Sequence, residues 1–484
     1  MSLLPALTLA LLVAQSPAPQ SAATPQIAWS VYELKTDDAP IAAELGRIRV
    51  PERRGAEGSR PITIAFARIR STAPNPGAPI IYLDGGPGGS GVGAAQAPGW
   101  ASLFRALRAT SDVILLSQRG TGLSDRIGCR GGAPLADGVL ASAVRMIEDA
   151  AARAKACAAS MRAQDVDLAG YTSVESADDI DAIRAALGVP KVSLVGFSYG
   201  THLALATLQR HGARIERVVL LGTEGPDDTW KLPAVYDRQV LAIDALLKAD
   251  PRTRGVMGNF SETLHALLDR TSREPLTVTI TSGGQPRRLQ VGAAGILYLL
   301  RRDIGDTNDL PWIPSFVYET QAGNLTRLGR LLERRLPSLE SGVQMMATAM
   351  DCSSAASPRR LATIDAQSPT SIFGALTDFP FPAVCAATEI APLGEAFRQP
   401  VSTRVPALFV SGTLDSNTPP AQAEAVMRGF PNATHIIVEG AGHESTLTPA
   451  VHERILAFLR GEHVPSATLP GRAPVFDLPK GGGR

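Results

Sequence analysis

Short apolar runs alternate with amphipathic stretches along the first half of the chain. Five of these runs are rich in valine, isoleucine and leucine and end in glycine or polar residues, as expected of strands: residues 62–70, 79–86, 112–120, 191–198 and 217–225. Residues 176–188 instead repeat apolar positions at helical spacing and end at Gly188. Apolar strands joined by helical crossovers are typical of a sheet that is buried on both faces. The pattern therefore predicts an α/β fold with a mostly parallel central sheet.

The second half of the chain begins differently. Residues 226–400 are rich in amphipathic helical pattern, as in 235–249 and 325–336, and strand-like runs return only at 406–412 and 435–442. A large helical insertion between two parts of one sheet explains this order. The predicted division is a signal peptide (1–23), the first part of the core (24–225), a helical cap (226–400), the second part of the core (401–463) and a Pro/Gly-rich tail (464–484).

The N-terminus has the features of an export signal. Its first 14 residues are apolar and too few to span a membrane, and small residues follow at 21–23. The competing interpretation is an apolar segment that is not cleaved. No later stretch reaches 18 uninterrupted apolar residues, so no membrane span is expected in the mature chain. The predicted location is the periplasm or the exterior of the cell.

The four cysteines of the chain are consistent with export. An even number in an exported protein favours disulfides, and pairing between sequence neighbours is favoured among the three possible connectivities. The alternative is four buried thiols. Because no two cysteines form a C-x-x-C pair, a zinc site has little support. We therefore expect no metal and no cofactor, and the favoured pairs are Cys129 with Cys157 and Cys352 with Cys385.

Composition narrows the classes of partner. The net charge is +1 and no basic cluster is present, which argues against nucleic acid or an anionic membrane surface as the main partner. Hydrophobic residues make up 44% of the chain, enough for a large core. A peptide or small acyl substrate is the expected partner, and the pattern predicts no particular oligomeric state.

The chemistry concentrates at the ends of predicted strands. Residues 196–200 read Gly-Phe-Ser-Tyr-Gly directly after an apolar strand and before a helical pattern. This is the context of a nucleophile elbow, with Ser198 as the nucleophile. A serine hydroxyl needs a base that a third group orients, and the order in this type of site is serine, acid, histidine. Asp415 and His443 follow two later strands and fit that order, although a turn-forming aspartate and a solvated loop histidine are the alternatives.

The glycine-rich loop after residue 83 has two interpretations. Gly86, Gly88 and Gly91 match the dinucleotide-binding fingerprint G-x-G-x-x-G. That interpretation requires an acidic residue at the end of the next strand, where this chain has Ser-Gln-Arg at 117–119. A loop in this place can instead supply one N–H group of an oxyanion hole, paired with the N–H of the residue after the nucleophile. The oxyanion-hole interpretation is favoured, with Gly85 or Gly86 and Tyr199 as donors.

Together, the segments GGPGGSG, QRGTGLS, GFSYGTH, SGTLDSNTPP and GAGHES resemble the α/β-hydrolase peptidases of the proline iminopeptidase and tripeptidyl aminopeptidase group. The resemblance covers nearly the whole mature chain. It implies an α/β-hydrolase fold with Ser198 as nucleophile, His443 as base and Asp415 as its orienter. Asp84 stands where proline iminopeptidases usually have histidine, and Ser117 where aspartate usually precedes QRG; the first departure is closer to the secreted tripeptidyl branch.

The resemblance implies an exported serine peptidase that acts near a free N-terminus, of prolyl or tripeptidyl type, through an acyl-enzyme on Ser198. Such an enzyme must hold an ammonium group, which calls for a carboxylate. Glu224, at the end of the strand 217–225, is the first candidate, and Glu319 in the cap is the second. Asp178, Asp179 and Asp181 are expected to cap and solvate the helix that they begin. The alternatives are an esterase or other small-acyl hydrolase with the same triad, and a catalytically silent binding protein on this fold.

Overall fold

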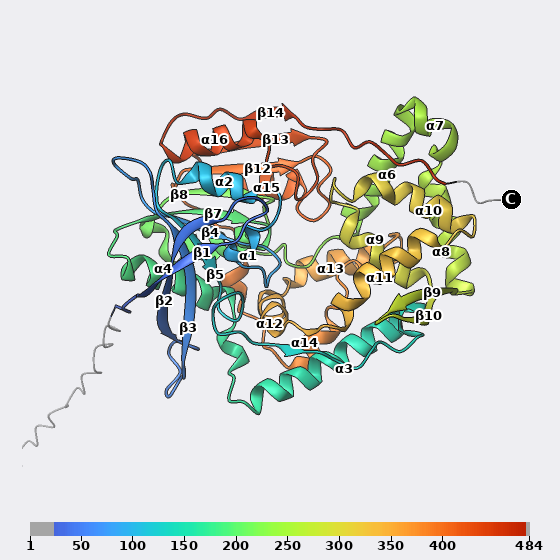
Figure 1. Cartoon of the computed structure of the whole chain (residues 1–484), viewed down its shortest axis with the longest axis horizontal. Coiled ribbons are helices and arrows are strands. Elements are labelled where there is room, and N and C mark those ends of the chain that lie inside the picture. The colour runs from blue at the N-terminus through green and yellow to red at the C-terminus, as the bar shows by residue number, and fades with distance from the viewer. Residues whose placement is uncertain (1–23, 481–484) are drawn as a thin grey trace, which may run out of the picture.

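The computed structural model describes residues 24–480 and contains one ten-stranded sheet. The predicted signal peptide, residues 1–23, lies outside the described residues. Figure 1 shows the sheet on one side of the molecule and a helical cap on the other. In spatial order the strands are β1 (Ala28–Leu34), β2 (Ile41–Pro51), β3 (Pro61–Ile69), β5 (Val113–Ser117), β4 (Ile80–Leu83), β7 (Val192–Phe197), β8 (Ile215–Leu221), β12 (Ala407–Gly412), β13 (Ala433–Glu439) and β14 (Ala467–Pro470).

The sheet is parallel from β5 to β14, as the apolar runs predict, and antiparallel from β1 to the β3–β5 pair. Alternate residues of the inner strands enter different cores: Val113 and Leu115 pack on one face, Ile114 and Leu116 on the other. Burial on both faces explains why these strands are apolar at every position. The helices over the sheet include α2 (Trp100–Leu107) and α16 (Pro449–Leu459) on the first face, and α4 (Ser173–Ala186), α5 (Tyr199–His211) and α15 (Pro420–Met427) on the second.

The helix predicted at 176–188 begins earlier than expected. It is α4, whose first turn is capped by the Thr172 side chain, which accepts a hydrogen bond from the Glu175 backbone N–H. The three aspartates expected to cap it therefore lie within the helix and do not cap it. Asp179 is 1% exposed and bonded to Arg119, so the expectation that it is solvated is wrong.

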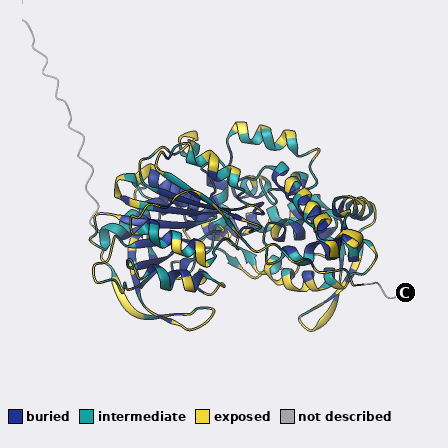
Figure 2. Ribbon diagram, turned by 90° about the horizontal axis from the view of Figure 1, so that it is seen from above, coloured by how far each residue is buried: buried dark blue, intermediate teal, exposed yellow. Residues whose placement is uncertain are grey.

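The cap has a hydrophobic core of its own, separate from the two cores of the sheet. Figure 2 shows this second buried interior beside the buried strands. Between β8 and β12 the chain forms α6 (Pro233–Ala249), α7 (Pro251–Met257), α8 (Phe260–Arg273), β9 (Leu276–Ser282), β10 (Gln285–Val291), α9 (Ala293–Asp303), α10 (Ile313–Gln321), α11 (Thr326–Glu340), β11 (Gly342–Val343), α12 (Met345–Ser354), α13 (Pro358–Gln367) and α14 (Ala383–Thr388).

A segment of the first sheet half also joins the cap. After β5 the chain leaves the sheet and forms β6 (Cys129–Arg130), which pairs with β11, and then α3 (Ala143–Arg162), which packs against α14. Leu140 and Met146 lie in the cap core. The cap is therefore built from two separate parts of the chain, where the sequence pattern indicated only residues 226–400.

Two disulfides join elements around this region, in the pairing that the sequence favoured. Cys129 and Cys157 link β6 to α3, and Cys352 and Cys385 link α12 to α14. All four cysteines are thereby paired. The second disulfide closes a loop within the cap.

The C-terminal tail contributes to both halves of the molecule. Residues 467–470 form β14, which pairs in parallel with β13, so the sheet extends past the expected boundary at residue 463. The chain then crosses to the cap, where Phe476 is buried in the cap core and the Asp477 backbone N–H donates to the Pro311 carbonyl at 2.9 Å. Paired backbone and an apolar anchor explain why this Pro/Gly-rich segment is ordered as a strap. Among the described residues, 24–480, no helix is long and apolar enough to span a membrane.

Candidate active site

Ser198 lies at a sharp turn between β7 and α5. Its φ of 54° and ψ of −125° are unusual for a residue with a side chain and cost free energy that the surrounding packing must offset. The flanking glycines permit the turn: a Cβ on Gly196 would lie 2.5 Å from the Gly200 carbonyl oxygen, and a Cβ on Gly200 would lie 2.0 Å from the Leu83 carbonyl oxygen. The close approach of the backbone therefore requires glycine at both positions of the G-x-S-x-G pattern.

Three predicted residues form a continuous hydrogen-bonded chain. His443 Nε2 lies 2.9 Å from Ser198 Oγ, and His443 Nδ1 lies 2.8 Å from Asp415 Oδ2. Asp415 follows β12 and His443 follows β13, so both lie in loops at the carboxyl ends of parallel strands. With Nδ1–H donating to the carboxylate, Nε2 is left to accept the serine proton.

The carboxylate of Asp415 is surrounded by donors although it is only 3% exposed. It accepts hydrogen bonds from the Asn417 and Thr418 backbone N–H groups, both at 2.8 Å, and from the Thr418 hydroxyl at 2.7 Å. Burial raises the pKa of Asp415, but His443 and these donors outweigh burial and lower it overall. Burial lowers the pKa of His443, whereas Asp415 raises it, and the net shift is upward from 6.5. This is the arrangement that stabilises an imidazolium during proton transfer.

The glycine-rich loop contacts the nucleophile. A Cβ on Gly85 would lie 2.9 Å from Ser198 Cβ, which places this loop directly beside the serine. Tyr199 is the first residue of α5, so its backbone N–H has no partner within the helix, while its hydroxyl lies 2.9 Å from Ser173 Oγ, in the core. The structure thus brings Gly85, Gly86 and Tyr199 to the same side of the site as Ser198.

Asp84 lies beneath this loop. Its carboxylate accepts a hydrogen bond from the Tyr82 hydroxyl at 2.9 Å. Burial raises the pKa of Asp84 to about 6, although Tyr82 and the backbone N–H groups of Gly85 and Ser90 lower it. Because the Gly85 N–H interacts with the Asp84 carboxylate, Gly86 remains as the candidate loop donor for an oxyanion.

Comparison with known families agrees with this geometry. The model of the family described as alpha/beta hydrolase fold matches residues 78–450, most of the chain. The chain belongs to the α/β-hydrolase family. Residues 1–77 and 451–484, which include the first three strands and the strap, lie outside the match.

Individual relatives match parts of this α/β hydrolase. The tripeptidyl aminopeptidase of Streptomyces coelicolor is 31% identical over 207 residues, which is 40% of this chain and 37% of that protein. The serine protease Hip1 of Mycobacterium tuberculosis is 40% identical over 60 residues, 12% of either chain. Each alignment therefore covers well under half of the relative's own length.

Solved structures match much of the chain at low sequence identity and with low TM-scores. A proline iminopeptidase from Mycobacterium smegmatis is 14% identical with a TM-score of 0.40, over 83% of this chain and 95% of that one. A thermophilic esterase from Thermogutta terrifontis is 16% identical with a TM-score of 0.37, over 86% and 99%.

The triad of this α/β hydrolase opens into a cavity of about 720 Å³ beneath the cap. Ser198, His443, Gly85 and Gly86 line it on the sheet side. Acidic side chains outnumber basic ones in the lining, and we call this set the acidic wall: Asp84, Glu224, Asp303, Asp306, Asp309, Asp351, Asp378 and Glu444, against Lys231, Arg301, Arg302 and Arg335. The cavity thus has an excess of carboxyl groups.

The two carboxylates chosen from the sequence lie in different places. Glu224 lines the cavity, where its Oε2 accepts a hydrogen bond from Lys231 Nζ at 2.6 Å. Glu319 does not line the cavity: it is 3% exposed, pairs with Arg327 at 3.0 Å and accepts the Lys480 backbone N–H at 2.8 Å. The second choice is therefore wrong, because Glu319 joins the strap to the cap.

Most charged residues of the cavity were missed in the sequence. Three of them, Lys231, Asp351 and Asp378, lie in the cap, without a motif around them. Burial raises the pKa of Asp351 well above its ordinary value, and Glu224 adds to that shift. Burial raises the pKa of Asp378 to about 6, although the Lys231 backbone N–H partly lowers it. Within residues 24–480 no three His, Cys, Asp or Glu side chains are grouped so as to hold a metal ion.

Proposed function

We propose that this α/β hydrolase is a serine peptidase that cleaves peptides near a free N-terminus through an acyl-enzyme on Ser198. The observation that carries the proposal is the acidic wall, which lies in the same cavity as the triad. A hydrolase of neutral acyl groups has no use for an excess of carboxyl groups around its substrate, whereas a substrate ammonium requires them. The partial match to a tripeptidyl aminopeptidase supports the same class of substrate.

Catalysis begins when His443 Nε2 takes the proton of Ser198 Oγ, which attacks the substrate carbonyl carbon. The resulting oxyanion accepts hydrogen bonds from the backbone N–H groups of Gly86 and Tyr199. The imidazolium, stabilised by Asp415, then gives its proton to the departing amine, and the C–N bond breaks. Water attacks the acyl-enzyme with His443 as base again, which releases the acid and restores Ser198.

The ammonium of the substrate is held at the acidic wall. Glu224 is already paired with Lys231, so the negative charge of Glu224 is partly neutralised. Burial lowers the pKa of Lys231, but Glu224 outweighs burial and raises that pKa overall. Asp378 accepts the Lys231 backbone N–H through Oδ1, while its buried Oδ2 has no hydrogen-bond partner among the described residues. Asp351 and Asp378 add further carboxyl groups, and an ammonium bound beside them favours their charged form, since a nearby cation lowers the pKa of a carboxyl group.

We also propose that the protein is exported. The disulfides Cys129–Cys157 and Cys352–Cys385 support it, because disulfides persist in oxidising compartments and are rare in the cytosol. Residues 1–23 are the proposed signal, and the mature enzyme acts in the periplasm or outside the cell.

The test compares a free-amine tripeptidyl anilide with its N-acetylated form. Removing an ammonium from paired carboxylates costs about 2–5 kcal/mol, so acetylation is expected to lower kcat/KM by more than tenfold. Glu224→Gln is expected to reduce this difference, whereas Glu216→Gln, an exposed glutamate on the same strand β8, is not. Equal kcat/KM values for both forms would contradict the aminopeptidase and leave the esterase as the function.

A further inference from the structure

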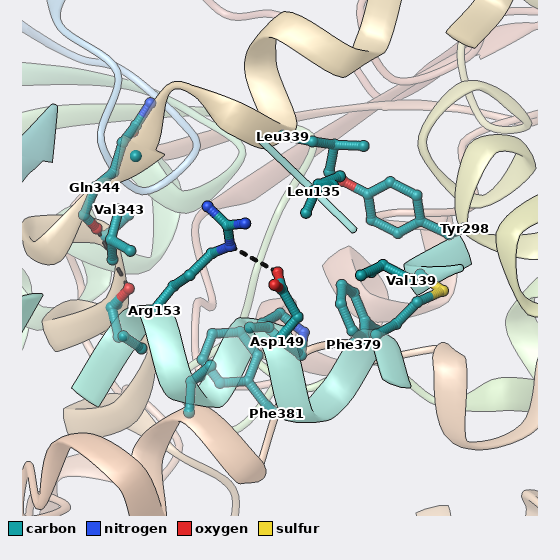
Figure 3. A pocket seen from close by; sticks show the side chains of 18 of the residues that line it. Leu135, Val139, Asp149, Arg153, Tyr298, Leu339, Val343, Gln344, Phe379 and Phe381 are labelled. Carbon is teal, nitrogen blue, oxygen red and sulfur yellow. Dashed lines mark hydrogen bonds and ion pairs between the residues drawn. The ribbon is translucent and has the colours of Figure 1, made fainter. Parts of the chain in front are cut away.

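A second cavity of about 430 Å³ lies between the cap and α3 (Figure 3). We call it the annex. Its walls come from α3, α9, α11, α12 and the segment 379–381, so it is built from both chain segments that form the cap. The annex is mostly apolar, and its side chains include Leu135, Val139, Tyr298, Leu339, Phe379 and Phe381.

Two of the charged side chains that line the annex neutralise each other. Asp149 and Arg153, one turn apart on α3, form an ion pair with 2.7 Å between Arg153 Nε and Asp149 Oδ2, drawn as a dashed line in Figure 3. The rings of Tyr298 and Phe379 pack edge to face, with centroids 5.4 Å apart. An apolar side chain that enters this space gains contact area without leaving a charge unpaired.

The annex adjoins the catalytic cavity. Four residues line both spaces: Arg301, Asp351, Phe379 and Phe381. Asp351 is thus a carboxyl group at the junction, on the same helix α12 as Ala347 and Thr348 of the annex wall. Arg301, the other charged residue there, donates from Nη1 to the Thr377 carbonyl at 2.7 Å, which leaves Asp351 as the acidic group facing both spaces.

We infer that the annex binds the apolar side chain of the substrate's N-terminal residue, with Asp351 at its mouth holding the ammonium of that same residue. This assignment rests on the proposed function. It follows from covalent geometry: the side chain and the ammonium of an N-terminal residue leave the same Cα, so a site for one must adjoin a site for the other. The junction at Asp351 supplies both at once. The annex thereby selects peptides that begin with a bulky apolar or aromatic residue.

The test uses three free-amine p-nitroanilides, Phe-Ala-Ala, Gly-Ala-Ala and Gly-Phe-Ala. The bulky side chain is at the first position in one, absent in the next and at the second position in the last. Wild type is expected to hydrolyse Phe-Ala-Ala with a kcat/KM at least tenfold above the two others. Ala150→Phe fills the annex from α3. We expect it to bring the preference, which is the ratio of kcat/KM for Phe-Ala-Ala to kcat/KM for Gly-Ala-Ala, close to 1. Ala152→Phe is the matched control, since Ala152 is an exposed alanine on the same helix, and it retains the preference.

Asp351→Asn provides a second variant that does not crowd the annex. It is expected to lower the ratio of free-amine to acetylated Phe-Ala-Ala hydrolysis at least tenfold while the preference for Phe over Gly persists. Thermal denaturation verifies that each variant is folded. A preference near 1 in wild type, a preference unchanged in folded Ala150→Phe, or a preference for Gly-Phe-Ala would overturn the inference. Failure of the proposed function is distinct, because the acetylated and free peptides would then react equally.

Discussion

Two buried carboxyl groups differ in the hydrogen-bond donors around them: one follows the carboxyl end of strand β12, and the other lies in the cap. Asp415 accepts hydrogen bonds from two backbone N–H groups, a hydroxyl and an imidazole, and its pKa is lowered. Asp378 accepts one backbone N–H, and burial raises its pKa to about 6. The sheet thus carries a carboxylate whose partners are all within the protein. In the cap, Asp378 has a buried Oδ2 without a hydrogen-bond partner among the described residues, and we propose that a substrate ammonium supplies that partner.

In our proposal, the residues that carry out the reaction lie on the sheet side, and the groups that select the substrate lie in the cap. The triad is complete without substrate, because the strand ends position Ser198, Asp415 and His443 by backbone geometry. The acidic wall and the annex are shaped by packing between distant parts of the cap. Substitutions in the two regions should therefore change different measurable quantities.

Ser198→Ala should have the largest effect, since it removes the nucleophile from the sheet side. We expect kcat to fall by about 10⁴-fold or more, as for other triad serines. Stability should scarcely change, because alanine keeps the Cβ and the substitution removes only a hydroxyl group whose side-chain hydrogen bond is to His443. Anilide hydrolysis and a thermal melt measure the two quantities, and a folded variant with a tenth or more of wild-type activity would contradict the role of Ser198.

Arg119→Ala should show the opposite behaviour, a large loss of stability with little change in chemistry. Arg119 is fully buried, and its Nε and Nη2 donate to Asp179 at 2.8 and 2.7 Å. Removing one member of a buried ion pair costs about 3–5 kcal/mol. Urea denaturation measures this loss, with the exposed Arg126→Ala as control, expected within about 0.5 kcal/mol of wild type. An unchanged free energy of unfolding would show that the pair adds no net stability.

The smallest expected effect is a difference between two pH profiles. With a neutral ester, kcat/KM should rise with pH through one pKa above 6.5, because His443 must lose its proton to act as base. With a free-amine peptide, protonation of Asp378 below about pH 6 also weakens ammonium binding. The acid limb should therefore be steeper for the peptide, by up to about tenfold per additional pH unit. Superimposable profiles would indicate that the cap carboxyl groups do not meet the ammonium.

The sequence predicted the sheet and the meeting of Ser198, Asp415 and His443 because the signals for both are local. The G-x-S-x-G turn, the apolar strands and the polar loops that follow them are each readable within about ten residues. The cap lacked such local signals. Helix α3 joins it from a distant part of the chain, and only the packing of the cap brings Asp351 and Asp378 into the cavity of Ser198. Glu319 was misjudged for the same reason, since its partners Arg327 and Lys480 lie eight residues away and in the strap.

The most direct test of the account is covalent labelling with a tripeptidyl phosphonate ester, which mimics the tetrahedral intermediate on the nucleophile. The reagent is compared in free-amine and N-acetylated forms, and the labelled residue is located by peptide mass mapping. The account predicts one label, on Ser198, and inactivation by the free-amine form at least tenfold faster than by the acetylated form. A label on another residue, or equal rates for the two forms, would contradict it.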